Sequence, residues 1–409
     1  MKPERIGAAA AAELPVRYSG LDDILRRVPV SVVWELTLAC DLACQACGSR
    51  AGTRRRDELT TAEALDLVGQ IAELGARSIG LIGGEAYLRK DWLQIVRAIR
   101  DAGMECDLQT GGRNLTLDRV KAAADAGLCA VGVSIDGIGA THDRLRGVPG
   151  SFEMALIAMR NVRAAGLNIG VNTQINARTL HELPELMDII IAEGSHNWQL
   201  AITTAMGNAA DHADMLLQPW QMLEVLPLLA GLAEQGRERG LFLQPASNIG
   251  YFGPHESRLR NIMNDEIHFH GCHAGDTVMG IEADGSIKSC PGLPSPYVGG
   301  NIKERRLRDI WENADPIAFT RRRTVDDLWG YCRGCYYAET CLAGCTWTSH
   351  ALMGRAGNNP MCYHRAADFA AKGQRERLVK VKDAGGKSFD HGEFAIVVEA
   401  IPQDIPVHA

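Results

Sequence analysis

The chain has 409 residues, a hydrophobic fraction of 46% and a formal net charge of −7. This length is enough for one large domain and a smaller one. The acidic balance argues against nucleic acid as the main partner. No apolar run reaches the roughly eighteen residues of a membrane span, and the alanine run at 8–12 is too short for a signal-peptide core. We therefore expect a cytoplasmic protein without a membrane partner.

Taken in chain order, the sequence predicts a short amphipathic helix at 21–28 and an apolar strand within 30–38. A cysteine-containing loop follows. Thr60 and Glu63 then form a capping box that opens a helix, and Gly75 ends it. From there strands and helices alternate. The expected strands are 78–82, 105–110, 129–135, 168–176 and 197–203, and the expected helices are 60–74, 92–102, 117–126, 152–165, 183–193 and 221–238.

This alternation implies parallel strands with right-handed crossovers. Counting from Ser31 gives six strand–helix units, which suits an α/β fold of the partial (β/α)6 TIM-type barrel kind. An open doubly wound sheet and an eight-unit barrel are the alternatives, and neither accounts for the cysteine-rich second half. In such barrels the chemistry lies at the carboxyl ends of the strands.

The twelve cysteines divide unevenly along the chain. Three fall at 40–47 and seven between 272 and 362, and disulfides are not expected in a reducing compartment. Cys106 and Cys129 are isolated in predicted strands, where a free cysteine packs as a small apolar residue. The clustering of the other ten indicates metal binding.

Cys40, Cys44 and Cys47 stand at a C-x3-C-x2-C spacing where the first strand passes into a loop. A loop can wrap three sulfurs around one face of an iron–sulfur cube, and three ligands leave one iron open to an exogenous group. The alternatives are a zinc site without its fourth ligand, or three unrelated cysteines.

The motif in this position resembles the radical S-adenosylmethionine (SAM) superfamily. The resemblance implies a [4Fe-4S] cluster whose fourth iron is chelated by the amino and carboxyl groups of SAM. When reduced, the cluster cleaves SAM to a 5′-deoxyadenosyl radical, which abstracts a hydrogen atom. The sequence departs from the family at Ala46, where an aromatic residue is frequent, so the adenine loses a stacking neighbour while the thiolates are unaffected.

Polar residues at later strand ends extend the resemblance. The turn after the second strand is similar to the family's GGE turn, whose polar atoms receive the amino group of SAM. Residues 142–147 look like an HDxxRG segment, whose arginines would face SAM or an acidic substrate group. The resemblance makes Asn172 and the Ser134 region candidates for the SAM carboxylate and ribose; without it, each residue could equally solvate a strand end. The predicted SAM-binding residues are Gly83, Gly84, Glu85, Ser134, Asp136 and Asn172.

The second half carries a hairpin signal around Asp284-Gly285 and a cysteine string that by itself could include a zinc knuckle. Seven cysteines exceed one tetrahedral site and fall short of two. The full spacing resembles the SPASM domain, a carrier of two auxiliary [4Fe-4S] clusters, which makes three clusters in all. The implied distal set is Cys332, Cys335, Cys341 and Cys362, and the implied nearer set is Cys272, Cys290 and Cys345.

The nearer set lacks a fourth cysteine. We expect an open or exchangeable site there rather than ligation by His268, His270 or His273. The expected domains are an N-terminal lead-in at 1–29, a radical SAM partial barrel at 30–240, a bridging region at 241–271, a small α+β SPASM domain at 272–365 and a C-terminal tail at 366–409. In the tail we expect a charged helix end, a glycine-containing linker at 384–387 and an apolar strand at 394–398.

The layout is most similar to family members that oxidise or cross-link side chains of ribosomally made peptides. The expected partners are a precursor peptide, a separate peptide-recognition protein and an electron donor such as flavodoxin or ferredoxin. The alternatives are a protein oxidase of the sulfatase-maturating type, a tetrapyrrole or small-molecule oxidase and, from another class, a non-catalytic metal scaffold.

Overall fold

The computed structural model describes residues 19–249, 253–260 and 271–402. In this part of the chain one curved sheet has the strand order β10-β9-β8-β1-β2-β3-β4-β5-β6-β7. Its strands are β1 (Ser31–Glu35), β2 (Ser78–Ile82), β3 (Glu105–Thr110), β4 (Ala130–Ser134), β5 (Asn168–Ile175), β6 (Asn197–Ile202), β7 (Phe242–Pro245), β8 (Val278–Ile281), β9 (Ser286–Lys288) and β10 (Val298–Asn301). Strands β1 to β7 are all parallel, each paired with the next in chain order.

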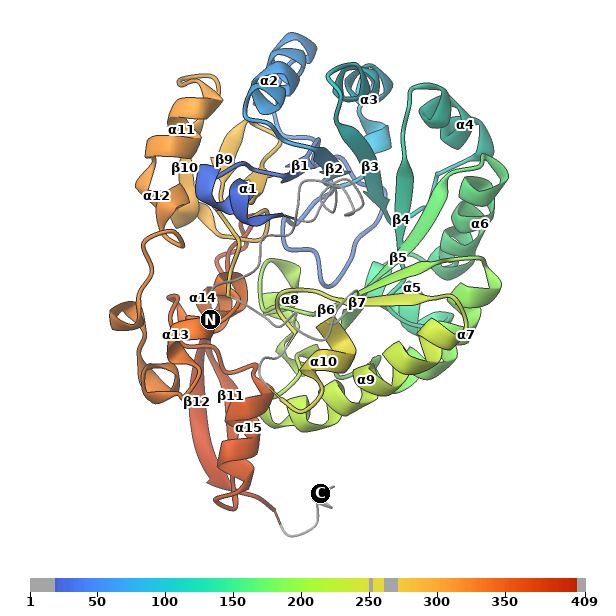
Figure 1. Ribbon diagram of the computed structural model, residues 1–409. Coiled ribbons are helices and arrows are strands. Elements are labelled where there is room, and N and C mark those ends of the chain that lie inside the picture. The colour runs from blue at the N-terminus through green and yellow to red at the C-terminus, as the bar shows by residue number, and fades with distance from the viewer. Residues whose placement is uncertain (1–18, 250–252, 261–270, 403–409) are drawn as a thin grey trace.

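Helices cover the outer face of this sheet (Figure 1). The main connecting helices are α2 (Thr61–Glu73), α3 (Trp92–Asp101), α4 (Leu117–Asp125), α6 (Ser151–Ala164), α7 (Leu183–Ala192) and α9 (Met222–Glu238). The shorter helices are α1 (Leu21–Arg26), α5 (Ala140–Arg146), α8 (Asn208–Asp211), α10 (Glu256–Arg260), α11 (Leu307–Asn313), α12 (Asp315–Ala318), α13 (Ala338–Cys341), α14 (Thr346–Met353) and α15 (Tyr363–Ala370). Among the helices of the described residues, none combines the length and apolar character that crossing a membrane requires.

Helix α2 begins where the sequence predicts. The hydroxyl of Thr60 accepts the Glu63 N–H at 3.3 Å, and the Thr60 N–H donates to the Glu63 carboxylate at 2.7 Å. This capping box satisfies two backbone donors that the first turn leaves without helical partners. The buried side chains of α2 include Leu67, Val68 and Ile71, which recur at helical spacing.

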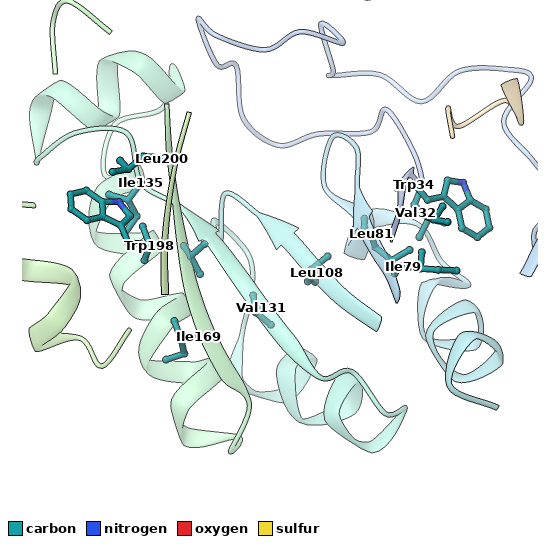
Figure 2. Packing of buried hydrophobic residues seen from close by; sticks show 14 of the residues in the cluster. Val32, Trp34, Ile79, Leu81, Leu108, Val131, Ile135, Ile169, Trp198 and Leu200 are labelled. Atoms are coloured by element: carbon teal, nitrogen blue, oxygen red, sulfur yellow. The ribbon is translucent and has the colours of Figure 1, made fainter. Parts of the chain in front are cut away.

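The core lies between the sheet and these helices (Figure 2). Val32, Trp34, Ile79 and Leu81 from β1 and β2 are at most 1% exposed. Each fully buried aliphatic side chain of this kind contributes about 1.5–3 kcal/mol to folding. This packing fixes the strand ends, from which the loops of the site extend.

The predicted fold class is confirmed, but the sheet continues beyond the six expected units at both edges. Strand β7 comes from the segment expected as a bridge, and it pairs with β6 because Leu241 and Leu243 are buried against the core. The predicted hairpin, β8 and β9, joins the barrel through a parallel pairing of β8 with β1. That pairing covers the edge of β1, which would otherwise expose unpaired backbone groups.

The tail forms an antiparallel hairpin of β11 (Gln374–Lys382) and β12 (Glu393–Ala400), which stands beside α14 and α15 (Figure 1). Strand β12 contains the predicted apolar strand, and α15 is the predicted helix end, whereas β11 was not foreseen. Of the two isolated cysteines, Cys106 is fully buried in β3, and Cys129 is half-buried just before β4.

Candidate functional site: three cysteine groups

The loop of the first cysteine motif follows β1 and is held by backbone hydrogen bonds from both sides. The Ala43 N–H donates to the Arg146 carbonyl at 3.0 Å, and the Gln45 N–H donates to the Leu145 carbonyl at 2.8 Å. These two bonds fix the loop to α5. On the other side, the amide of Asn208 in α8 donates to the Cys44 carbonyl at 2.8 Å. The three sulfurs therefore sit on a loop with defined backbone positions.

Each sulfur of this loop has a donor within reach. The Leu42 N–H lies 3.4 Å from Cys40 Sγ, and the Ala51 N–H lies 3.3 Å from Cys47 Sγ. Arg146 Nη1 lies 3.6 Å from Cys44 Sγ. Donors of this kind stabilise a thiolate, which is the form that binds metal. Burial raises the pKa of the Cys40 thiol to about 12, so metal binding here displaces a proton.

The glycines of the predicted GGE turn are needed for close backbone contact. A Cβ at Gly84 would lie 2.2 Å from the Ala39 carbonyl oxygen, and one at Gly83 would lie 2.3 Å from the Thr37 carbonyl oxygen. The Gly84 N–H donates to the Thr37 carbonyl and the Glu85 N–H to the Ala39 carbonyl, each at 2.8 Å. The turn therefore packs directly on the segment that leads into Cys40. Glycine is needed at both positions because a side chain would collide with the backbone of that segment.

Glu85 is fully buried beside this contact. Its carboxylate accepts the Thr110 hydroxyl at 2.5 Å and the Gly111 N–H at 2.7 Å. Burial raises its pKa to about 7, although these two hydrogen bonds oppose the shift. A bound cation would restore the ionised form.

Asp41 is a candidate that sequence reasoning missed. Its carboxylate, the Cys40 sulfur and the Glu85 carboxylate offer atoms that all lie within 4.8 Å of one another. Asn114 Nδ2 donates to Asp41 Oδ2 at 2.5 Å, and the buried Oδ1 has no hydrogen-bond partner among the described residues. The signal lay in the motif itself, because Asp41 directly follows the first cysteine.

Asp136 and Arg146 form a buried ion pair behind the second cysteine. Arg146 Nη2 lies 2.7 Å from Asp136 Oδ2, and the Gln174 N–H donates to Asp136 Oδ1 at 2.9 Å. Asp136 is 4% exposed, and in this structure its carboxylate pairs with the arginine. The arginine in turn reaches Cys44, so the run at 142–147 serves the cysteine loop.

Ser134 and Asn172 lie side by side as partners in the β4–β5 register. The Asn172 amide donates to Gln109 Oε1. Gly132 makes room for both amides, since a Cβ there would lie 2.0 Å from Gln109 Oε1 and 2.7 Å from Asn172 Nδ2. The structure thus adds Gln109 to this group of polar side chains on neighbouring strands.

The four cysteines of the distal set line one small cavity, to which Asn359 and Arg365 also contribute. The N–H of Asn359 lies 3.4 Å from Cys332 Sγ, and the N–H of Tyr337 lies 3.4 Å from Cys335 Sγ. Burial raises the pKa of Cys341, and the other three thiols of the set raise it further. Four converging thiols with backbone donors fit an iron–sulfur cluster.

The three cysteines of the nearer set also converge. Burial raises the pKa of Cys290 to about 12, and the neighbouring Cys272 and Cys345 add to the shift. Of the three histidines considered as a fourth ligand, His268 and His270 lie outside the described residues. His273 is exposed, and its carbonyl accepts the N–H groups of Asp276 and Thr277.

A parallel α/β barrel with a three-cysteine loop after its first strand, followed by a cysteine-rich hairpin domain, is the arrangement that the sequence motifs predict for the radical SAM class. Residues 34–190 match the radical SAM superfamily, and residues 272–336 match SPASM, an iron–sulfur cluster-binding domain. The chain therefore carries a radical SAM domain and a SPASM domain, and these domains imply SAM and iron–sulfur clusters as its cofactors.

Two kinds of enzyme are among the similar proteins. The AdoMet-dependent heme synthase of Methanosarcina barkeri is 29% identical over 352 residues, which cover 83% of this chain and 98% of that protein. The PqqA peptide cyclase of Rhodopseudomonas palustris is 29% identical over 387 residues, which cover 90% and 95%.

Two solved structures share the fold. Streptococcus suis SuiB bound to S-adenosylmethionine has a TM-score of 0.64 at 17% identity, covering 82% of this chain and 76% of that one. Native anSMEcpe with bound AdoMet has a TM-score of 0.64 at 15% identity, covering 84% of this chain and 97% of that one.

Proposed function

We propose that this enzyme oxidises or cross-links a side chain of a ribosomally made peptide held between the SAM site and the nearer auxiliary cluster. Bound SAM and a reduced [4Fe-4S] cluster would supply a 5′-deoxyadenosyl radical that abstracts a hydrogen atom from the substrate. The observation that carries the proposal is the match to PqqA peptide cyclases along nearly the whole of both chains. The expected partners are the precursor peptide, a recognition protein and an electron donor.

In this proposal the residues of the barrel hold SAM. Cys40, Cys44 and Cys47 ligate the first cluster, and the acidic pair of Asp41 and Glu85 receives the SAM ammonium group. The buried Asp41 oxygen, which has no hydrogen-bond partner among the described residues, supports this role. A cation at this place would also restore the ionised form of Glu85, which burial disfavours. The Gly83-Gly84 backbone sets the distance between this pair and Cys40.

Other side chains then orient the rest of the cofactor. Ser134 and Asn172, together with Gln109, offer hydroxyl and amide groups to the carboxylate and ribose. Asp136 acts indirectly, because it holds Arg146 against Cys44. The SPASM cysteines ligate the two auxiliary clusters, which would accept the electron left on the oxidised substrate.

A tetrapyrrole is the second candidate substrate. The observation that favours it is the match to an AdoMet-dependent heme synthase over 98% of that protein's length. Both candidate functions use the same SAM site. They differ in the substrate, a peptide or a tetrapyrrole, that lies between the SAM site and the nearer auxiliary cluster.

The first test separates SAM cleavage from substrate modification. In anaerobically reconstituted enzyme, Cys40→Ala should abolish 5′-deoxyadenosine formation, whereas Cys335→Ala should keep SAM cleavage and lose product. Normal cleavage by the Cys40 variant would show that this loop does not carry the SAM cluster.

The second test decides the substrate class. Peptides encoded beside this gene should gain a mass shift when incubated with SAM and reductant, and iron or metal-free porphyrins bearing carboxylate side chains should not. Turnover of a porphyrin without any peptide shift would replace the first candidate by the second.

A further inference from the structure

The turn of the C-terminal hairpin, residues 387–391, reaches the first cysteine loop from about 340 positions away in the sequence. We call this turn the Phe389 loop. Its Phe389 N–H donates to the Gly48 carbonyl at 2.9 Å, and the Ser388 hydroxyl donates to the Ser49 carbonyl at 2.7 Å. Gly48 directly follows Cys47, so the contact is made at the edge of the cysteine motif.

Arg50 connects this contact to the barrel through hydrogen bonds. Its Nε donates to Asp390 Oδ1 and to the Lys387 carbonyl, each at 3.1 Å, while Nη1 donates to Asp211 Oδ2 at 2.6 Å. The Asp390 carbonyl accepts the Gly207 N–H at 2.8 Å just before α8. The side chains of Arg50 and Asp390 are each 15% exposed, so water competes little for their ion pair.

The other side of the Phe389 loop faces the nearer auxiliary cysteines. The ammonium of Lys288 lies 3.6 Å from the centre of the Phe389 ring, and Lys288 is two residues before Cys290. The His391 ring meets the His350 ring edge-on at 5.0 Å, and His350 is five residues after Cys345. One short turn therefore contacts the neighbourhoods of two cysteine groups.

Two residues at this contact have an unusual backbone conformation. Phe389 has a φ of 54° and Arg50 a φ of 49°, both in the left-handed region that residues other than glycine rarely adopt. Residues in such conformations persist only where the surroundings determine them, and they gather at functional sites. Here the two residues belong to the two sides of one contact.

We propose that the Phe389 loop is part of the active site, in which Phe389 and Asp390 are positioning residues for the Cys47 end of the SAM-cluster loop. The loop holds that end at a fixed place relative to Lys288 and His350 of the SPASM domain. The inference rests on the assignment of Cys40, Cys44 and Cys47 to the SAM cluster, and it does not depend on the substrate.

The test compares Asp390→Ala with Asp383→Ala in the full-length, anaerobically reconstituted enzyme. Asp383 lies in the same connection between β11 and β12, directly after β11, but its side chain is 87% exposed and pairs only with Lys380 among the described ion pairs. SAM is titrated against the electron paramagnetic resonance signal of the reduced enzyme. Because charged hydrogen bonds are lost, the Asp390 variant should need about tenfold more SAM for the same spectral change, and the control should match wild type.

A second readout follows the contact itself. Hydrogen exchange at the Gly207 amide, which donates to Asp390 in the folded protein, should be slow in wild type and faster in Asp390→Ala. Asp390→Asn keeps an oxygen for Arg50 and should restore part of the SAM affinity. Phe389→Ala should weaken SAM binding in the same direction, with the auxiliary-cluster signals unchanged as evidence of folding.

Wild-type SAM affinity in both Asp390→Ala and Phe389→Ala would overturn the inference while leaving the proposed function intact. Faster exchange at Gly207 without a change in SAM affinity would also overturn it, because the loop would then be merely structural. A wild-type enzyme that shows no SAM-dependent signal would remove the cluster assignment and the inference together.

Discussion

Glu35, at the end of β1, is a buried carboxyl that lacks full compensation. It is 2% exposed, and its Oε1 has no hydrogen-bond partner among the described residues. Burial raises its pKa to about 7, and Glu282 adds to the shift, while Arg55 and Lys288 oppose it. These four side chains gather where β1 meets β8 and β9.

The raised pKa predicts a pH-dependent cost to stability. Between pH 4.5 and about 7 the unfolded chain has ionised this carboxyl while the folded protein still holds its proton, so stability falls as pH rises through this window. Glu35→Gln stays neutral, so it should exceed wild type by about 1–3 kcal/mol above pH 7 and match it near pH 4.5. Urea unfolding of both chains at pH 5 and pH 8 measures the difference. A less stable variant at pH 8 would mean that attraction to Arg55 and Lys288 outweighs burial.

Two glycines with opposite surroundings test the close contact at the GGE turn. A Cβ at Gly84 would lie 2.2 Å from the Ala39 carbonyl oxygen and 2.9 Å from the Cys40 Cβ, whereas one at Gly69 in α2 meets nothing within 4 Å. Gly84→Ala should therefore cost about 1–3 kcal/mol through overpacking and lose the SAM-dependent signal. Gly69→Ala should add about 0.5–1 kcal/mol, because alanine favours a helix interior. A Gly84→Ala protein that binds SAM normally would show that the turn tolerates displacement.

The strand–helix alternation and the cysteine spacings could be read from the sequence because local patterns determine them. Strand β11 could not, since its charges resemble those of a solvated helix. Its Glu376 is buried against Arg365 of α15, with the two guanidinium nitrogens 2.6 and 2.7 Å from the carboxylate oxygens. Charge neutralisation by a partner in another element leaves no local signal in the strand.

The same limit applies to the candidate site. The motif predicted Cys40, Cys44 and Cys47 as cluster ligands, and the GGE turn predicted Gly83, Gly84 and Glu85 as residues of the SAM site. The Phe389 loop was missed because nothing near Phe389 in the sequence shows that it meets Gly48. Asp136 was predicted as a SAM-binding residue, whereas its ion pair with Arg146 could not be foreseen, because it depends on the packing of α5 against the cysteine loop.

At the scale of the whole molecule, the C-terminal tail packs against the rest of the protein and completes its core. Breaking the buried pair by Glu376→Ala should cost about 3–5 kcal/mol, because it leaves the Arg365 charge uncompensated. Arg365 also lines the cavity of the distal cysteines, so this variant should loosen the distal cluster as well. Thermal unfolding and the rate of iron loss to a chelator measure the two effects. Unchanged values would mean that water replaces the lost carboxylate.

Because the cysteines form three separate groups, we expect that one cluster can be lost by substitution while the other two keep their iron. Wild type should hold about twelve irons after anaerobic reconstitution, as three four-iron clusters. Cys44→Ala and Cys341→Ala should each lose about four irons, because each removes a ligand from a different group. Cys106→Ala is the matched control: this residue is fully buried in β3, apart from the three groups, and its loss should leave the iron content unchanged. Equal iron loss in all three variants would indicate global unfolding, and about two zinc atoms with no iron would contradict the cluster assignments.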